Sequence, residues 1–488
     1  MENKKNNRPA IKVQTLIDDK HPAPVTRRDF LSRGMIGLSA YCVLPTAIGM
    51  IARENQARAD DCPSAGAAAG MLPFLVFDLA GGASLSGNCI PMDKGGNLLP
   101  SYSQLGMGDP SKFSQMSINT AFGAPMAGPG PLAAAAMGGG VAQTSKLLEG
   151  ILSKTSAQAQ ACIRMGLLCH NSQSDSGANL HSATAQVSMA GYQGSLLRSG
   201  VGMQSSSSGG NTGVPFADPT LKPLPMRSVN DLTGALSYGP GLTNLPDQAL
   251  KALAKATMNL TLEQSNNLSR RNLGQQFAAL LKCGFSRNID FTAPVQGIDP
   301  RLEPVFQKNY GLNPGSDPNN SVTAAIVMNV LKGNTGPGTI QMGGYDYHDN
   351  TQTSGDGADF RAGQEIGTAL QAAFDMGQPL VFQVLTDGAI SSQDGNRNWA
   401  GDSNEKGATI VGMIRPQGAP SMRRTQIGSF TAGQGADSTS IVGSDTKMVS
   451  FAVFANYLAM CGQTAVFDRV VQISGLSSAS LDQVLMFG

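Results

Sequence analysis

Charged side chains, aromatic rings and histidines are all scarce in this chain. Of its 488 residues 14% are charged and 6% are aromatic, and there are one Trp and four His. The formal net charge is +1, and no basic stripe is interleaved with aromatic residues, so nothing indicates that the chain binds nucleic acid. Apolar residues still make up 41% of the chain, which is enough to bury a core and argues against global disorder.

Cysteine is present without the spacing of a metal or redox motif. No two cysteines form a Cys-x-x-Cys arrangement, which disfavours a zinc knuckle. Cys169-His170 can belong to a metal site or be a buried structural pair at the end of an apolar segment, and we favour the buried pair. If Cys42 is removed with an N-terminal signal, an even number of cysteines remains: Cys62, Cys89, Cys162, Cys169, Cys283 and Cys461. In an oxidising compartment these can form disulfides, and the sequence does not choose among the pairings.

The N-terminal 59 residues have the organisation of an export signal. A polar, basic stretch leads to Arg27-Arg28, an apolar pair and a moderately apolar segment at 35–52. This resembles the twin-arginine signal, which a receptor reads as an address, although Ser32 stands where a Lys is usual. Small residues at 57–59 suit a signal peptidase, so we expect cleavage near Ala59. The resemblance implies that the twin-arginine translocase and signal peptidase are partners during export, and that the protein is periplasmic or secreted.

Two other interpretations of the N-terminus are weaker. The segment 35–52 is just long enough to be an uncleaved membrane anchor, but Gly37, Pro45 and Gly49 dilute it and a cleavage-like sequence follows. A lipoprotein is disfavoured as well, because Cys62 follows two aspartates instead of apolar and small residues.

Apolar runs and helical periodicity alternate along the rest of the chain. This alternation predicts an α/β fold with a mainly parallel sheet and helices on both faces. We expect one domain over 60–488, with Gly/Ser-rich insertions at about 100–145 and 195–320. Strands are predicted at 72–79, 338–342 (ended by Gly343-Gly344), 380–386 and 408–414, and helices at 247–283, 321–332, 360–376 and 448–461.

Acidic residues follow or close three of the predicted strands. Asp78 stands near the end of the first strand, Asp346 follows the second, and Asp387 follows the third. Ligands bind outside the carboxyl ends of parallel strands, so we expect these three side chains on one edge of the sheet.

The segment 343–350, Gly-Gly-Tyr-Asp-Tyr-His-Asp-Asn, is the densest cluster of potential metal ligands. In extended chain Asp346 and His348 point the same way, so they suit zinc or another divalent ion. The alternative is an Asp/Asn-rich turn whose side chains bond to nearby main-chain amides, with Asp346 capping the turn and His348 packing locally.

Taken in order, these motifs resemble an uncharacterised family of twin-arginine-exported proteins within the alkaline phosphatase and sulfatase superfamily. Members carry Gly-Gly-aromatic-Asp-Thr-His, later Ser-Glu-Phe-Gly-Arg and then Thr-Asp-His-Gly, and often Gly-Gly-Ala-Asp near the start. The corresponding segments here are 343–348, 384–388 and 80–84, and 181–186 is similar to a shifted Ser-His-Phe-x-Ala-Gln. The matches are short and are scattered over most of the mature chain.

The resemblance implies a two-metal site and a Ser or Thr nucleophile. Carried over, Asp346 and His348 match as ligands, and Asp387 stands where the family has Glu. Asp402 matches the Asp of a later Asp-His pair, but Ser403 replaces the His. Ser84 stands where an Asp is common, and Ser182 or Ser84 would be the nucleophile. Asp78 is a substitute ligand, and Zn²⁺, Mg²⁺, Ca²⁺ or Mn²⁺ would suit the set.

Ligands are thus missing at two expected places, and this leaves three functions open. The chain can be a degenerate member that acts in extracytoplasmic binding or assembly. It can be a metal-dependent hydrolase of phosphate or sulfate esters. It can also be a component associated with a secretion or cell-surface apparatus, which the same observations support.

Overall fold

The structure is a computed structural model of the whole chain. It describes residues 70–89, 91–97, 99, 117–119, 122–124, 126–128, 145–171, 181–190, 192, 196–199, 223–236, 297–346, 352–386, 390–392, 399–402, 406–431, 435–443, 445–467 and 481–488. The expected signal at 1–59, most of both expected insertions and the predicted helix at 247–283 lie outside these residues.

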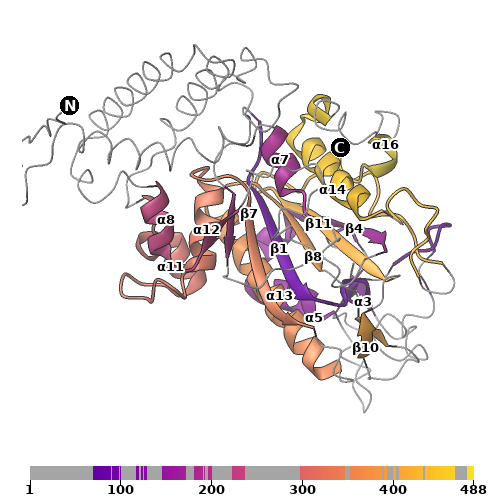
Figure 1. The fold of residues 1–488 in the computed structure, drawn as a ribbon, viewed down its shortest axis with the longest axis horizontal. Coiled ribbons are helices and arrows are strands. Elements are labelled where there is room, and N and C mark those ends of the chain that lie inside the picture. The colour runs from indigo at the N-terminus through magenta and orange to yellow at the C-terminus, as the bar shows by residue number, and fades with distance from the viewer. Residues whose placement is uncertain are drawn as a thin grey trace, which may run out of the picture.

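A mixed eight-stranded sheet forms the centre of the molecule, with strand order β12-β4-β11-β8-β1-β7-β5-β6 (Figure 1). β11 runs antiparallel to both of its neighbours, β4 and β8, and every other neighbouring pair is parallel. The strands are β1 (Phe74–Gly81), β4 (Ile163–His170), β5 (Leu197–Ser199), β6 (Leu224–Met226), β7 (Gly338–Tyr345), β8 (Leu380–Thr386), β11 (Gly407–Ile414) and β12 (Gln426–Ile427). Two separate hairpin-like pairs are β2 (Ser117–Asn119) with β3 (Met126–Gly128), and β9 (Ile390–Ser392) with β10 (Trp399–Asp402).

Helices cover both faces of the sheet, because the central strands are apolar on both sides. Along β1, Leu75 and Phe77 face a core that α5 (Lys146–Lys154), α12 (Val322–Leu331) and α13 (Gln352–Asp375) close. Phe74 and Val76 alternate to the other face, under α7 (Thr184–Ala190) and α14 (Thr446–Cys461). The shorter helices are α3 (Leu85–Asn88), α6 (Ala157–Ala161), α8 (Val229–Leu236), α11 (Pro304–Tyr310) and α16 (Leu481–Val484), with 3₁₀ turns at Pro300–Leu302 and Thr464–Val466.

The predicted α/β class, mainly parallel sheet and helices on both faces are confirmed. β8 matches its predicted range, and α12 lies one residue inside its prediction at each end. The predicted break at Gly343-Gly344 is wrong, because β7 continues to Tyr345 with Gly344 at φ +88°. Tyr345 is buried, and its hydroxyl donates to Ala358 O at 2.9 Å, which anchors the end of the strand to α13.

Glycines allow α5 and α13 to pack with their backbones in contact. A Cβ at Gly363 would clash with the carbonyl oxygen of Leu147, and one at Gly150 would clash with the carbonyl oxygen of Phe360. This contact joins two segments far apart in the sequence and fixes the position of α13 beneath the sheet.

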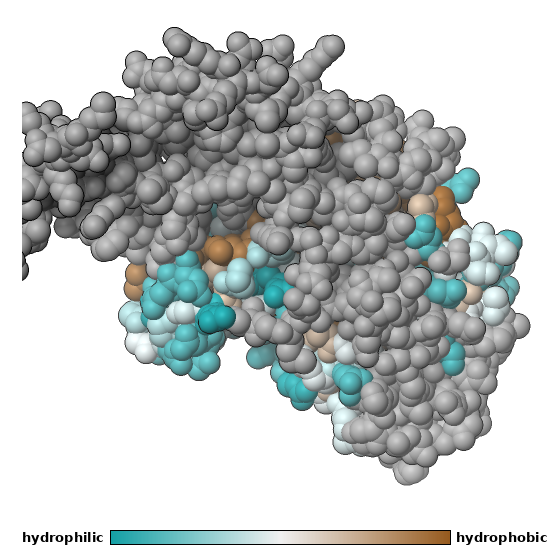
Figure 2. Space-filling view, in the orientation of Figure 1, coloured by the Kyte–Doolittle hydropathy of each residue, from teal (hydrophilic) through white to brown (hydrophobic). Residues whose placement is uncertain are grey.

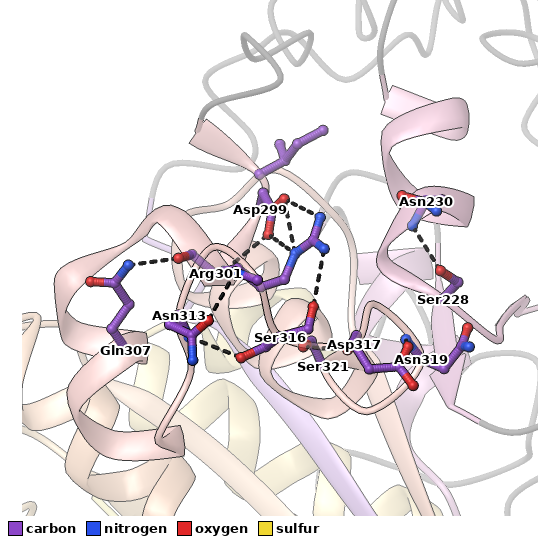
Figure 3. Close-up of polar contacts among 12 residues, drawn as sticks. Ser228, Asn230, Asp299, Arg301, Gln307, Asn313, Ser316, Asp317, Asn319 and Ser321 are labelled. Atoms are coloured by element: carbon purple, nitrogen blue, oxygen red, sulfur yellow. Dashed lines mark hydrogen bonds and ion pairs between the residues drawn. The ribbon is translucent and has the colours of Figure 1, made fainter.

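The segment around α11 is polar and bonded to itself. Arg301 pairs with Asp299 (Nη2–Oδ2 2.7 Å, Nε–Oδ1 3.0 Å) and donates through Nη1 to Ser316 O (Figure 3). Asn313 N donates to Ser316 Oγ at 2.9 Å. Figure 2 shows the hydrophilic surface over α11 and the residues that follow it. These contacts hold a solvated loop in place.

The described cysteines are unpaired: Cys89 and Cys169 are buried, and Cys162 and Cys461 are partly buried. Cys62 and Cys283 lie outside the described residues. None of the helices in the described part of the chain has both the length and the apolar character needed to cross a bilayer.

Candidate functional site

The carboxyl ends of β8, β1 and β7 meet at one edge of the sheet, as the parallel pairing requires. Gly81 lies opposite Tyr345 at this edge and adopts φ +135°. A Cβ at Gly81 would clash with the main chain of Tyr345 and Asp346, so the turn after β7 lies directly against the end of β1. Asp346 is exposed at this place.

Asp78 lies inside β1 rather than at its end. The strand continues to Gly81, and Asp78 pairs in register with Gln341 and Leu385. Its side chain is fully buried and, by alternation, faces α7 and α14 together with Phe74 and Val76. Asp78 therefore belongs to the covered face of the sheet.

Ser84 follows β1 at the same edge, in the turn that leads to α3. Ser84 is buried, and its main-chain carbonyl oxygen accepts a hydrogen bond from Asn88 Nδ2 at 3.0 Å. The preceding amide, Ala83 N–H, donates to Thr386 Oγ1, and that hydroxyl donates to Leu79 O, both at 2.9 Å. The end of β8 thus holds the turn that carries Ser84.

Ser182 lies in the segment that starts α7. It is 1% exposed, and its Oγ lies 3.1 Å from Thr184 Oγ1 and accepts from Thr184 N–H at 3.4 Å. Gln383 of β8 fixes the same segment, because its Oε1 accepts from Ala183 N–H (3.2 Å) and its Nε2 donates to His181 O (2.7 Å). Ser182 and Gln383 together hold the start of α7 on the sheet.

Two buried histidines meet beside this segment. The rings of His170 and His181 have centroids 4.4 Å apart and an interplanar angle of 58°. His170 bonds through Nδ1 to Asn171 O (2.9 Å) and through Nε2 to Thr409 Oγ1 (3.0 Å). His181 bonds through Nδ1 to Thr386 O (3.3 Å).

The hydrogen bonds define the tautomer of each ring. A carbonyl oxygen only accepts, so Nδ1 carries the proton in both, and the Nε2 of His170 accepts from the Thr409 hydroxyl. The Nε2 of His181 is buried and has no hydrogen-bond partner among the described residues. Burial lowers the pKa of His170 to about 4, and burial together with the neighbouring His170 lowers the pKa of His181 well below its ordinary value. Both rings are neutral at pH 7.

The remaining sequence-predicted ligands are not brought together within the described residues. Asp402 ends β10 in a separate two-stranded sheet, and His348 and Asp387 lie outside the described residues. No group of three or more His, Cys, Asp or Glu side chains that could hold a metal ion occurs in the part of the chain that the structure describes. The expected convergence of Asp346 with His348 and Asp387 stays a prediction.

Sequence reasoning missed the polar contacts that hold α7. One signal was available, since Gln383 interrupts the otherwise apolar run Leu-Val-Phe-Gln-Val-Leu at 380–385. A fully buried amide must find partners, and it finds them at the start of α7. Cys169 and His170 are both buried, as the structural interpretation of that pair predicted.

A scan against protein-family models finds no family that matches this chain, and a search of curated proteins finds no relative.

Proposed function

We propose that this is a twin-arginine-exported protein with an alkaline phosphatase/sulfatase-like fold that acts in extracytoplasmic binding or assembly. The export part rests on Arg27-Arg28, the apolar segment 35–52 and the small residues before Asp60. The superfamily part rests on the motifs quoted above and agrees with a mostly parallel sheet between two helical layers.

The binding role is supported by one observation: polar residues near the carboxyl edge of the sheet are buried and bonded within the protein. Ser182 and Ser84 are 1% and 0% exposed, and Asp78 is 0% exposed. A nucleophile must come within hydrogen-bond reach of both a base and a substrate. Here the Ser182 hydroxyl instead orders the first residues of α7, and His181 bonds to the main chain of β8. These contacts keep the carboxyl edge of the sheet rigid. They therefore favour a binding role over ester hydrolysis, which needs an open edge.

One observation favours the hydrolase as the second candidate. Asp346 is exposed and lies against Gly81, where a ligand at the sheet edge would be reached from solvent. Asp346 would supply carboxylate oxygens, which suit a hard divalent ion. Association with a secretion or cell-surface apparatus is one form of the proposed binding role, and it shares the same support.

Metal content tests the proposal. We expect the exported, purified protein to hold no stoichiometric Zn, Mg, Ca or Mn by mass spectrometry. We also expect no hydrolysis of p-nitrophenyl phosphate or sulfate when these ions are added. One or two tightly bound ions per chain, lost together with turnover in Asp346→Asn, would establish the hydrolase instead. Asp317→Asn is the matched control, because Asp317 is another exposed turn aspartate that bonds to a nearby amide.

A further inference from the structure

Arg198 is a buried cation near the β6 edge of the sheet, which is the edge farther from the histidine pair. It is the central residue of β5 and lies between Thr339 of β7 and Pro225 of β6. Leu197 packs into the core beneath α12, so alternation turns Arg198 to the opposite face. Arg198 is 9% exposed.

No described residue neutralises this guanidinium. Its Nη1 is buried and has no hydrogen-bond partner, and none of the ion pairs among the described residues involves Arg198. Arg301 provides the contrast within the same chain, because both of its forked nitrogens are bonded to Asp299. An unpaired buried charge is strongly unfavourable, so an anion bound to it would stabilise the fold.

Arg198 lies one strand in from the β6 edge of the sheet. Pro225, its neighbour on the outer strand, is exposed, and β6 is only three residues long. The next residue, Ser199, turns to the other face of the sheet, where its hydroxyl accepts from Gln341 N–H at 2.9 Å. The guanidinium is therefore the group left to bind, and its planar fork matches two oxygens of a sulfate, phosphate or carboxylate.

We propose that Arg198 is the centre of an oxyanion-binding site that takes the sulfate, phosphate or carboxylate group of a small ligand. This gives a ligand class to the binding role and rests on that proposed function. It uses neither a metal nor the carboxyl-edge residues, so the two proposals fail separately. Bound metal with ester turnover would end the binding role and leave an anion response at Arg198 standing. A missing anion response would end only this site.

The test compares the thermal unfolding of three full-length exported proteins: wild type, Arg198→Met and Arg227→Met. Arg227 is exposed and lies just after β6, so it is a matched control for the loss of one positive charge. Sodium sulfate, phosphate and acetate are titrated separately, with sodium chloride holding the ionic strength constant. Comparing these salts shows which oxyanion class the site takes.

We expect sulfate or phosphate to raise the melting temperature of wild type and Arg227→Met along a saturating curve. Arg198→Met should keep only the shallow, non-saturating rise that excluded sulfate gives any protein. Isothermal titration should show affinity for the same anion at least about tenfold weaker in Arg198→Met. Without anion this variant should melt no lower than wild type, because an unpaired buried charge has been removed.

Equal saturating responses in wild type and Arg198→Met would overturn the proposal, as would the absence of any saturating response in wild type. Failure of Arg198→Met to fold would also count against it, since the guanidinium would then be bonded within the protein. Arg198→Lys keeps the positive charge but loses the planar guanidinium fork, so it tests whether the fork itself recognises the anion. Its affinity should fall between those of wild type and Arg198→Met, and wild-type affinity in Arg198→Lys would contradict recognition by the fork.

Discussion

The imidazole rings of His170 and His181 have centroids 4.4 Å apart in the interior. Their hydrogen bonds join the carboxyl ends of β4 and β8 to β11, which runs against both strands. His170 closes β4 and bonds to Thr409 of β11, while His181 bonds to Thr386 at the end of β8. The pair therefore fastens α7 to the sheet where three strands meet. Because both rings are neutral and fully buried, the fastening depends on pH.

The first prediction is acid-dependent loss of stability through this pair. The folded-state pKa of each ring is lowered below the ordinary value near 6.5, so the unfolded chain binds more protons as the pH falls. The contribution is complete above about pH 6.5 and is lost as the pH falls toward about 4, the folded-state pKa of His170. For His170 the loss is on the order of 3 kcal/mol.

Urea unfolding of wild type and His170→Gln at several pH values between 7.5 and 4.5 measures this loss. The variant should be less stable at pH 7.5 and show a smaller decline in the free energy of unfolding below pH 6.5. Identical slopes in the two proteins would mean that other groups cause the acid sensitivity.

A second prediction concerns Gln383. Gln383→Leu fits the apolar strand but leaves Ala183 N–H and His181 O without their partners, so we expect a loss of about 1–3 kcal/mol in the free energy of unfolding. Gln417→Leu is the control, because Gln417 donates one exposed bond to Gly377 O, and its loss should stay within about 0.5 kcal/mol. Equal effects in the two variants would show that Gln383 does not hold α7.

Local pattern was enough to predict much of the fold. β8 and α12 have strong apolar runs or helical periodicity, and their ranges follow from neighbouring residues alone. α13 begins at Gln352 rather than at the predicted Phe360, because its first turns carry Gly355 and Gly357 and few apolar residues. A strand was predicted at 408–414, where β11 lies, but its antiparallel direction was not, since strand direction depends on pairing and not on composition.

The candidate site was harder to predict for the same reason. Asp78 looks like a strand-end ligand in the sequence, but β1 continues past it and buries it beneath α7 and α14. The contact between His170 and His181 arises only when β4 and the start of α7 are placed on the same face of the sheet. Neither feature has a local signal, because each depends on which strands become neighbours.

A third prediction concerns export. Arg27→Lys with Arg28→Lys should keep the charge but abolish export, because a receptor reads the paired guanidinium groups. Fractionation should find the variant in the cytoplasm, with the unfolding transition of the wild-type protein. Lys4→Arg with Lys5→Arg changes two cations in the same segment and should leave export unchanged. Normal extracytoplasmic levels of the Lys-Lys variant would contradict the twin-arginine assignment.

The last prediction tests the close contact of α5 with α13 through two glycines of the same helix. In Gly363→Ala the new methyl would clash with Leu147 O and lie 2.9 Å from Gly150 Cα, so the helices must separate. Overpacking of this kind costs about 1–3 kcal/mol. In Gly357→Ala the new methyl meets only Arg361 Nη1, at 3.7 Å, and a helical Gly→Ala change then stabilises by up to about 1 kcal/mol. Opposite signs in urea unfolding would confirm backbone contact between the helices. Stabilisation in both variants would mean that α5 is free to move away from α13.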